Sequence, residues 1–530
     1  MDKRLERILP RVQKPARYVG GEYNAVLKDK AQVDTRIAFC FPDTYEIGMS
    51  NLGMRILYGV MNGMDGVWCE RVFAPWGDME EEMRKADMPL FALESGDPIT
   101  DFDIVAFSVG YEMAFPAILN MLDLARIPLH AAERTDLSPL VIAGGTAMYN
   151  AEPMADFIDL VSLGEGEDLT VELVELYRTA RREGWSKQQL LRAAAQLDGV
   201  YVPSLYDVTY HDDGTVAAIT PLDGAPAKVT KRIVHDMDKS YFPVKTIVPS
   251  TEIVQDRVTL ELFRGCIRGC RFCQAGQLYR PVRERSLEML KEYAVTMLKN
   301  TGQEEISLSS LSSSDYTRLP ELINFLIEDC NKNHVNISLP SLRIDAFSLD
   351  VMNKVQDVKK TSLTFAPEAG SQRLRNVINK GLTEEDIIKG ATLAFEGGWT
   401  RVKLYFMLGL PTETDEDIRG IAALSNQIAA TFFDVVPKDK RVNGRVQIVT
   451  STSFFVPKPF TPFQWARQCT KEEFIEKAYT TKRAIAEQLN QKSIKYNWHE
   501  ADTSVLEGVL ARGDRRIGAV LLNVYKQGAI

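Results

Sequence analysis

Residues 258–276 read VTLELFRGCIRGCRFCQAG, a short apolar strand candidate that runs directly into a loop with three cysteines. Cys266, Cys270 and Cys273 lie within eight residues, so their thiolates can face a single metal centre. A structural zinc site normally closes four protein ligands, and a ferredoxin cluster uses four cysteines. Here no fourth cysteine is near, which leaves one position open for a small chelating ligand. Zinc remains an alternative, because Cys330 or His334 could complete four ligands.

The strand before this loop is the first of six apolar segments that alternate with helical stretches. The segments begin near residues 258, 304, 335, 360, 401 and 444. Such alternation predicts a parallel sheet, and six strand–helix units over roughly 200 residues predict an incomplete (β/α)6 barrel, residues 251–456. Its active site is expected at the C-terminal ends of the strands.

An earlier alternation of strands and helices covers residues 36–185 and predicts a separate α/β domain with a parallel sheet. Ligands of such sheets bind at the C-terminal ends of the strands. Residues 186–250 lose this rhythm and place HDDG between two alternating runs, which predicts a connecting region with a β-hairpin. Residues 1–35 form a basic N-terminal arm, and residues 457–530 are predicted to be a helical C-terminal extension.

Composition narrows the class of protein. A chain of 530 residues should form more than one domain, and a formal charge of −9 argues against a broad nucleic-acid surface. No run approaches the about twenty apolar residues that span a bilayer, so no membrane association is expected. Seven cysteines without a disulfide pattern favour the cytoplasm. Six arginines surround the cysteines and suit either cofactor charge, a phosphorylated substrate, a reductase surface or ordinary salt bridges: Arg264, Arg268, Arg271, Arg280, Arg283 and Arg285.

The segment RGCIRGCRFC resembles the cluster motif of the radical SAM superfamily, and the likeness extends over roughly 251–455. It implies that the three cysteines hold a [4Fe-4S] cluster whose open iron chelates S-adenosyl-L-methionine (SAM), with Phe272 near the adenine. FAPEAGSQRLRNVINKG resembles the fourth-strand segment that contacts SAM, which implicates Glu368 and Ser371. SLSSLSSSD takes the place of a glycine-rich motif but has serines instead, so Ser309 is expected to contribute backbone groups. YFMLGLPTET resembles the fifth-strand signature.

The first α/β region resembles the flavodoxin-like (Rossmann-type) cobalamin-binding domain that precedes the barrel in one radical SAM subgroup. The run GEGE, with Gly164, Glu165 and Gly166, carries much of this likeness, and glycines there would let the corrinoid approach the backbone. In the DxHxxG motif of many cobalamin proteins, histidine ligates cobalt, whereas this chain has Asp43, Tyr45 and Gly48 at the corresponding positions. Because tyrosine is a poor cobalt ligand at neutral pH, either corrinoid binds without a protein histidine or the domain has lost it.

Segments near both ends resemble one family within this cobalamin-domain subgroup, for which the resemblance supplies no substrate. The predicted function is radical cleavage of SAM, with cobalamin-dependent methyl transfer as the reaction that a bound corrinoid would permit. The substrate, which could be RNA, a protein or a small molecule, stays open, and an electron donor such as flavodoxin or ferredoxin is implied. Candidates at the barrel mouth, which are equally explained by helical ion pairs, are His499, Glu500, Glu507, Arg512 and Asp514.

Three alternatives remain. The GLPTET segment also resembles methylthiotransferases, although these usually have three further N-terminal cysteines and only Cys40 and Cys69 occur here. A non-catalytic, zinc-binding or RNA-associated module would use the cysteines and the basic arm. A plain electron-transfer protein would have a cluster that does not respond to SAM. The sequence ends at Ile530 without an evident terminal helix cap, which leaves open that the natural chain continues.

Overall fold

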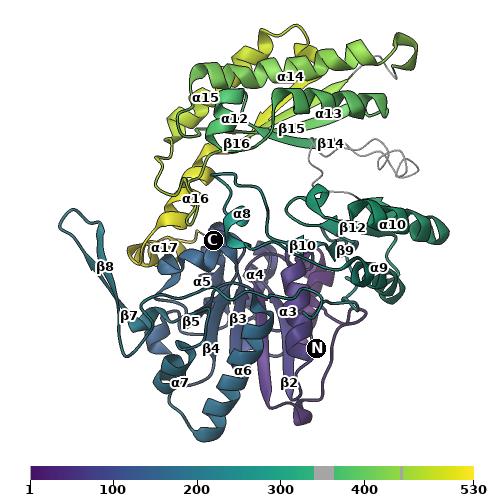
Figure 1. Cartoon of the computed structure of the whole chain (residues 1–530). Coiled ribbons are helices and arrows are strands. Elements are labelled where there is room, and N and C mark those ends of the chain that lie inside the picture. The colour runs from purple at the N-terminus through teal and green to yellow at the C-terminus, as the bar shows by residue number, and fades with distance from the viewer. Residues whose placement is uncertain (1, 339–362, 442–445, 530) are drawn as a thin grey trace. The chain divides into compact units, whose positions relative to one another are not determined.

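The computed structural model describes residues 2–338, 363–441 and 446–529 (Figure 1). The chain divides into two compact units. The first comprises Met1–Asp256, Lys299–Thr301 and Leu510–Ile530, and the second comprises Arg257–Leu298 and Gly302–Val509. In the described ranges, no helix is both long enough and apolar enough to cross a membrane.

The first unit is built on a six-stranded sheet in the order β2-β1-β3-β4-β5-β6. Its strands are β1 (Thr35–Phe41), β2 (Val67–Phe73), β3 (Ile104–Ser108), β4 (Leu140–Gly144), β5 (Leu160–Ser162) and β6 (Val200–Tyr201). The first five strands are parallel, and β6 pairs antiparallel with β5. The order 2-1-3-4-5 is that of the flavodoxin-like fold, so the predicted fold class is confirmed.

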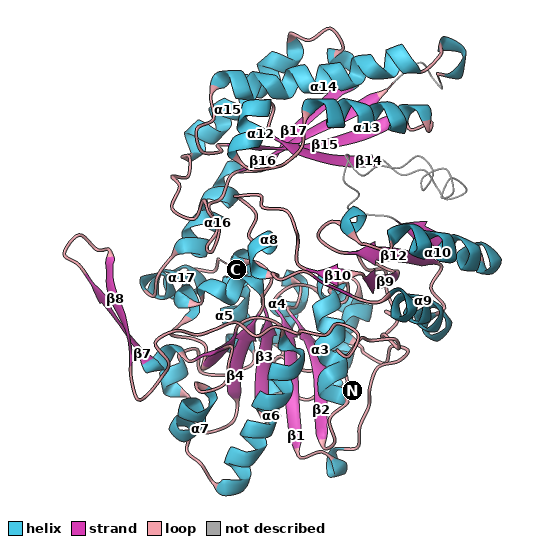
Figure 2. Cartoon of the chain, in the orientation of Figure 1, coloured by secondary structure: helices cyan, strands magenta, loops and turns pink. Residues whose placement is uncertain are grey.

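Helices surround this sheet because its strands are apolar on both faces (Figure 2). They are α1 (Lys3–Ile8), α2 (Tyr45–Gly48), α3 (Leu52–Asn62), α4 (Gly77–Lys85), α5 (Phe115–Leu124), α6 (Gly166–Glu183), α7 (Lys187–Ala194) and α17 (Arg516–Lys526). Local signals set their ends, as at α3, where the Asn51 side chain accepts the Met54 amide. Helix α17 packs against α5, where the Tyr525 hydroxyl donates to Asp123 at 2.7 Å. The C-terminal residues therefore belong to the first unit.

A β-hairpin follows this sheet in the chain. Strand β7 (Tyr206–Tyr210) pairs antiparallel with β8 (Val216–Pro221) around the HDDG turn. The hairpin lies in the segment where turn residues between alternating runs predicted one.

The second unit contains the predicted barrel strands in two parallel sheets, β13-β12-β9 and β14-β15-β16-β17. Its strands are β9 (Val258–Glu261), β10 (Phe263–Arg264), β11 (Arg283–Glu284), β12 (Glu305–Ser309), β13 (Asn336–Ser338), β14 (Leu363–Glu368), β15 (Arg401–Leu408), β16 (Gln447–Phe454) and β17 (Ile494–Trp498). The helices are α8 (Ala275–Leu278), α9 (Leu287–Thr301), α10 (Leu319–Asn333), α12 (Gln372–Val377), α13 (Glu384–Glu396), α14 (Asp415–Val435), α15 (Lys471–Ala486) and α16 (Ala501–Arg512). All six predicted strand segments therefore contain a strand.

Strand β17 differs from the prediction, because the segment that contains it was expected to be wholly helical. It pairs in parallel with β16 and extends the sheet by one strand. Ile494 and Tyr496 alternate along it and pack against Ala484 and Ile485 of α15. Only five residues carry this alternation, and helices flank them, so the periodicity was too short to recognise.

The core of the second unit lies between the β14–β17 sheet and helices α13 and α14. Val402, Leu404 and Phe406 of β15 point to this side. The residues between them point to the opposite face, because side chains alternate along a strand. This division leaves polar residues on the face of the sheet that the helices do not cover.

Candidate functional site

The cysteine loop begins directly after β10 and ends at α8. Gly265 precedes the first cysteine with φ +90°, a conformation that favours glycine. A Cβ at this position would also lie 2.7 Å from the carbonyl oxygen of Pro281 and 2.8 Å from that of Tyr279. The glycine is therefore required by a close backbone approach at the start of the loop.

Side chains outside the cysteines hold this loop in place. Arg268 donates from Nε to Asp315 at 3.0 Å, and the amide of Arg271 donates to the carbonyl of Ile378 at 2.9 Å. Asn379 donates to the carbonyl of Gly269, also at 2.9 Å. The loop is thus anchored to the segment after β12 and to the end of α12. Arg268 and Arg271 therefore stabilise the loop. A structural role of this kind was one of the alternatives considered for the arginines around the cysteines.

None of the three thiols forms a disulfide, and all three are partly exposed. Cys273 Sγ accepts the amide of Gly276 at 3.3 Å, and burial raises the pKa of this thiol. No group of three or more His, Cys, Asp or Glu side chains in the described part of the chain is gathered as a metal site. The thiols therefore share one anchored loop without converging on one point, and Cys330 and His334 do not complete a four-ligand site with them.

Two predicted SAM contacts lie together beside the loop. Phe272 packs against an apolar cluster, and the ammonium of Lys380 lies 6.0 Å from the centre of its ring. Lys380 also pairs with Glu368 at 3.0 Å. Glu368 has φ +67° at an irregularity that ends β14, so its carboxylate is placed by an unusual backbone conformation. The sequence analysis did not single out Lys380, although it lies near the end of the quoted segment FAPEAGSQRLRNVINKG, twelve residues beyond Glu368.

Ser371, predicted together with Glu368 to contact SAM, forms hydrogen bonds within the protein instead. It caps α12 by accepting the amide of Leu374 at 3.1 Å, and its hydroxyl donates to Asp417 of α14. Arg373 also pairs with Asp417, which is 3% exposed. Burial alone would raise the pKa of Asp417, but hydrogen bonds from Arg373, Ser371 and Thr414 outweigh it and lower the pKa to about 2. Ser371 therefore ties α12 to α14.

We expect Asp417→Asn to lower the free energy of unfolding by about 2 kcal/mol at pH 7, because the folded state holds this carboxylate ionised. The folded pKa is lowered, so the stabilisation is complete above pH about 4 and is lost as the pH falls toward 2. Urea unfolding at several pH values measures the gap between wild type and variant. A gap that does not shrink toward low pH contradicts the prediction, and Asp386→Asn, at an exposed helix cap, should show a smaller gap.

Ser309 contributes a backbone group, although to the protein itself. Its carbonyl accepts the amide of Leu262 at 3.0 Å, next to its register partner Glu261. Glu261 pairs with Arg264 at 2.9 Å and with Arg285 at 3.2 Å. The serine-rich segment therefore closes the sheet between β9 and β12, and two of the loop arginines neutralise a carboxylate on β9.

Contacts within the protein explain residues of both the FAPEAG and the GLPTET motifs. A Cβ on Gly370 would lie 2.3 Å from the amide nitrogen of Ile421, so α14 crosses this glycine at backbone contact. In the second motif, Glu413 accepts the amide of Gly409 at 2.9 Å and pairs with Lys477 of α15 at the same distance. Both motifs shape the ends of β14 and β15.

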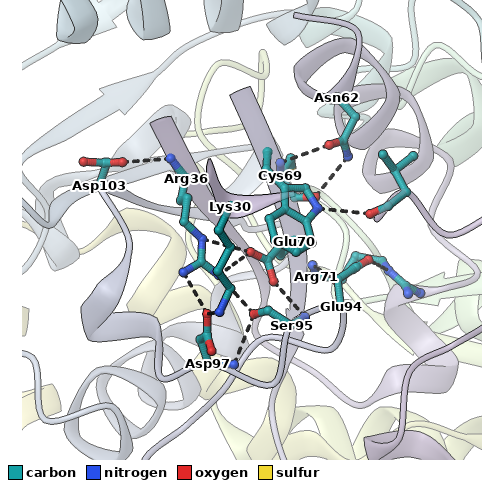
Figure 3. Close-up of polar contacts among 12 residues, drawn as sticks. Lys30, Arg36, Asn62, Cys69, Glu70, Arg71, Glu94, Ser95, Asp97 and Asp103 are labelled. Atoms are coloured by element: carbon teal, nitrogen blue, oxygen red, sulfur yellow. Dashed lines mark hydrogen bonds and ion pairs between the residues drawn. The ribbon is translucent and has the colours of Figure 1, made fainter. Parts of the chain in front are cut away.

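In the first unit, Tyr45 lies in a buried charge network. It is 2% exposed and donates to Glu22 at 2.9 Å. Glu22 pairs with Arg71 at 2.8 Å. Arg71 also pairs with Glu94 at 2.7 Å, and Figure 3 labels these two residues. Burial raises the pKa of Tyr45, so the phenol stays protonated. Tyr45 therefore does not stand in for a histidine ligand; Asp43, nearby, is exposed and accepts the amide of Thr44 at 2.6 Å.

Gly48 packs inside the unit rather than at an open surface. A Cβ at this position would lie 2.2 Å from Cε1 of Phe73 and 3.2 Å from Cδ1 of Phe41. The residue is therefore glycine because two aromatic rings occupy the space of a side chain.

We expect Gly48→Ala to lower the free energy of unfolding by about 1–3 kcal/mol, because the added methyl overpacks this contact. Thermal unfolding of the cofactor-free protein measures the change. Gly48→Ala combined with Phe73→Leu should recover part of the loss. If the single variant keeps wild-type stability but loses corrinoid affinity, the glycine serves the cofactor instead.

The GEGE run is covered by the chain itself. Gly164 has φ +107°, and its Cβ would lie 2.2 Å from the carbonyl oxygen of Arg232. The amide of Glu165 donates to the same carbonyl at 3.0 Å, while the Glu165 carboxylate accepts the amide of Val234 at 2.5 Å. A Cβ on Gly166 would lie 3.1 Å from Leu57. The predicted approach of a corrinoid to these glycines is thus replaced by an approach of residues 232–234.

Exposed apolar side chains instead mark three other loops at the C-terminal edge of the sheet. Ile47 follows β1, Trp76 follows β2 and Tyr111 follows β3, and their exposed fractions are 41%, 51% and 42%. Gly110 leaves open space beside Tyr111. The loops after β1 to β5 contain no histidine in the sequence.

The residues near the C-terminus that were predicted to line the barrel mouth mostly form hydrogen bonds and ion pairs within the protein. His499 donates its amide to Thr452 at 3.1 Å, directly after β17. Glu507 pairs with Lys458 at 2.7 Å, and Asp514 pairs with Arg516 at 2.6 Å. Glu500 accepts the amide of Ser504 through its carbonyl, and burial lowers the pKa of Arg512. Helical ion pairs and caps account for most of this group.

Two family descriptions match the chain in order. "Radical SAM proteins, N-terminal" matches residues 53–203, and "Radical SAM superfamily" matches residues 260–424, from the cysteine loop into α14. The chain belongs to the radical SAM superfamily. It is therefore a radical SAM enzyme, as the resemblance implied.

Two relatives of this radical SAM enzyme come from Methanocaldococcus jannaschii. The uncharacterised protein MJ0966 is 28% identical over 496 residues, which is 92% of this chain and 90% of the relative. MJ0865, whose name is that of a methylthiotransferase, is 27% identical over 169 residues, or 30% of this chain and 37% of the relative.

Solved structures of radical SAM enzymes share the fold. The methyltransferase TsrM from Kitasatospora setae, with cobalamin and a [4Fe-4S] cluster bound, has a TM-score of 0.51 at 14% identity, over 81% of this chain and 73% of that one. The cobalamin-dependent enzyme OxsB, with aqua-cobalamin and S-adenosylmethionine bound, has a TM-score of 0.50 at 15% identity, over 87% of this chain and 58% of that one.

Proposed function

We propose that Cys266, Cys270 and Cys273 hold a [4Fe-4S] cluster whose open iron binds SAM. The supporting observation is a single anchored loop with three partly exposed cysteines, none of them in a disulfide, and no fourth cysteine in the loop. Soft thiolates suit iron–sulfur clusters, and assembly would include rotation of the cysteine side chains toward one point. The bound cluster supplies one electron that cleaves SAM to methionine and a 5′-deoxyadenosyl radical.

The residues around the loop would position the nucleoside and shield it. The ring of Phe272 offers an apolar face beside the loop, and the pair of Lys380 with Glu368 fixes a carboxylate that can accept hydrogen bonds from SAM hydroxyl or amino groups. Arg268, held by Asp315, keeps the loop from moving away as charge builds at the site. Ser371 and Ser309 act through backbone and capping contacts.

We infer that the reaction is cobalamin-dependent methyl transfer, with the corrinoid at the C-terminal edge of the first sheet. The exposed side chains of Ile47, Trp76 and Tyr111 suit a flat, largely apolar macrocycle. Buried Tyr45 and the lack of a histidine in these loops fit a corrinoid without a protein imidazole on cobalt. When bound, the corrinoid supplies a transferable methyl group.

Methylthio transfer is the second candidate, because MJ0865 matches part of the chain. A second cluster of its own would require cysteines at an accessible N-terminal site. Cys40 and Cys69 are both 0% exposed on β1 and β2 and lie in the core of the first unit. This burial favours methyl transfer.

A reductant such as flavodoxin or ferredoxin is the proposed partner, and the cytoplasm is the proposed location. The substrate could be RNA, a protein or a small molecule.

Anaerobic reconstitution of the full chain tests both parts of the proposal. With dithionite and SAM, we expect 5′-deoxyadenosine and an electron paramagnetic resonance signal that SAM perturbs. Added hydroxocobalamin should copurify with the chain, and Trp76→Ala with Tyr111→Ala should weaken its retention. Nucleoside release without corrinoid binding would reject methyl transfer alone, whereas a cluster indifferent to SAM, or zinc without iron, would reject the whole proposal.

A further inference from the structure

A cavity of about 350 Å³ lies within the first unit, between α3, residues 24–26 and residues 241–247. This volume is in the range of small-molecule sites, and much of the wall is apolar. The lining includes none of the cysteine loop, and it reaches the segment after β1 at Gly48 and Met49. We propose that this cavity binds a small organic anion, with a carboxylate or phosphate group on Arg55 and an apolar body in the remaining space.

Arg55 is the residue that calls for an anion. Its Nε and Nη2 both donate to the carbonyl of Met49, at 3.0 and 2.8 Å. Among the described residues, no carboxylate forms an ion pair with Arg55, and its Nη1 makes no hydrogen bond. Nη2 has a second N–H beside the one that faces Met49, so one N–H from each of these nitrogens, along the Nη1–Nη2 edge, can donate to a ligand. That edge is the fork which binds a carboxylate or phosphate through two parallel hydrogen bonds.

The environment makes an anion favourable at this edge. Burial lowers the pKa of Arg55, and a longer-range attraction to Asp256 offsets this only in part. The guanidinium nonetheless stays charged in proteins. Arg55 is half-buried. A partly desolvated charge without a hydrogen-bonded counterion is costly, so a ligand that supplies one gains the energy of that pairing.

Two further groups on the wall suit the same ligand. Lys245 is exposed and adds a second cation at the cavity. The hydroxyl of Tyr58 accepts the amide of Val26 at 2.9 Å, which leaves its proton to donate to an anion. Burial raises the pKa of Tyr58, so this proton is present at neutral pH.

The apolar part of the ligand would lie against Tyr241 and Met54. The Tyr241 side chain packs on α3 at Gly59, where a Cβ would lie 2.1 Å from the phenol oxygen. The absence of a side chain at Gly59 therefore sets the position of this aromatic wall. An aryl or similarly flat body can stack there, while Met54 adapts to its shape.

The test uses the full chain and phenyl phosphate, with phenol and inorganic phosphate as its two halves. Isothermal titration calorimetry should show that phenyl phosphate binds more tightly than either half. Arg55→Met should weaken it by about tenfold or more, and Lys245→Gln by less. Arg178→Met, at an exposed ion pair, is the matched control and should bind as wild type does.

Arg55→Lys is a control for a folding defect. It keeps the positive charge but lacks the two parallel N–H donors, so it should bind phenyl phosphate with intermediate affinity. Benzoate in parallel assigns the anion: tighter binding than phenyl phosphate indicates a carboxylate, and weaker binding a phosphate. No binding of either compound to wild type up to about 10 mM would overturn the proposal, as would equal affinity in folded Arg55→Met. The result does not depend on whether the chain cleaves SAM.

Discussion

Cys270→Ala should reduce SAM cleavage below detection, a loss of at least about a thousandfold, because no other residue can take the place of the missing thiolate. The same result is expected for Cys266→Ala and Cys273→Ala. Each variant should also fall from about four irons per chain to a small fraction of that value. Iron and sulfide analysis after anaerobic reconstitution, with chromatography for 5′-deoxyadenosine, measures both effects.

Cys330→Ala and Cys469→Ala are the matched controls. Both remove a thiol from the same unit, but neither lies in the loop. They should keep wild-type iron content and nucleoside release. If Cys330→Ala instead loses metal together with the loop variants, four protein ligands close the site, and the zinc-type alternative gains support.

Arg71→Met should be the most destabilising substitution in the first unit, by about 3–5 kcal/mol. The side chains of Arg71, Glu22 and Glu94 are 3%, 2% and 1% exposed, and each carboxylate lies within 2.8 Å of the guanidinium. Removing the cation leaves two buried carboxylates without a counter-charge, although Glu22 keeps the Tyr45 hydroxyl and Glu94 keeps the backbone amide of residue 71. Thermal unfolding of the first unit should shift down by roughly 10 °C.

A neutralised background separates charge from packing in this experiment. Glu22→Gln and Glu94→Gln, added to Arg71→Met, should restore part of the lost stability, since no buried charge then remains. Arg178→Met breaks two surface ion pairs, with Asp34 and Glu175, and should cost about 0–1 kcal/mol. A change of less than about 1 kcal/mol in Arg71→Met would show that water reaches this network in the folded protein.

The side-chain contacts around the cysteine loop show which features of a site can be predicted from the sequence and which require the folded structure. The spacing of the three cysteines is a local property, because eight residues of one loop are enough to place three thiols together. The pairing of Lys380 with Glu368 also joins residues close in the chain, but both side chains first need the turn that ends β14. Arg268 pairs with Asp315, which is forty-seven residues away in the chain, and no sequence periodicity predicts this pairing.

The glycines of the first unit illustrate the same limit. Gly164 was predicted to let a corrinoid approach the backbone, and Gly48 was predicted to correspond to the glycine of the DxHxxG motif. In the structure, Phe73 occupies the space beside Gly48, and Arg232 occupies the space beside Gly164. A sequence reports that a residue has no side chain but not which neighbour makes this necessary, because the neighbour is chosen by packing between distant segments.

The amino-acid sequence was enough to predict the two α/β regions, their parallel sheets and a loop with three closely spaced cysteines. These depend on periodicities and spacings over ten to twenty residues, where backbone geometry dictates the outcome. The folded structure was needed to show that β17 joins the sheet, that Tyr45 belongs to a charge network and that Arg55 lines a cavity. Each of these depends on contacts between segments far apart in the chain, whose burial and charge compensation are set when the units pack.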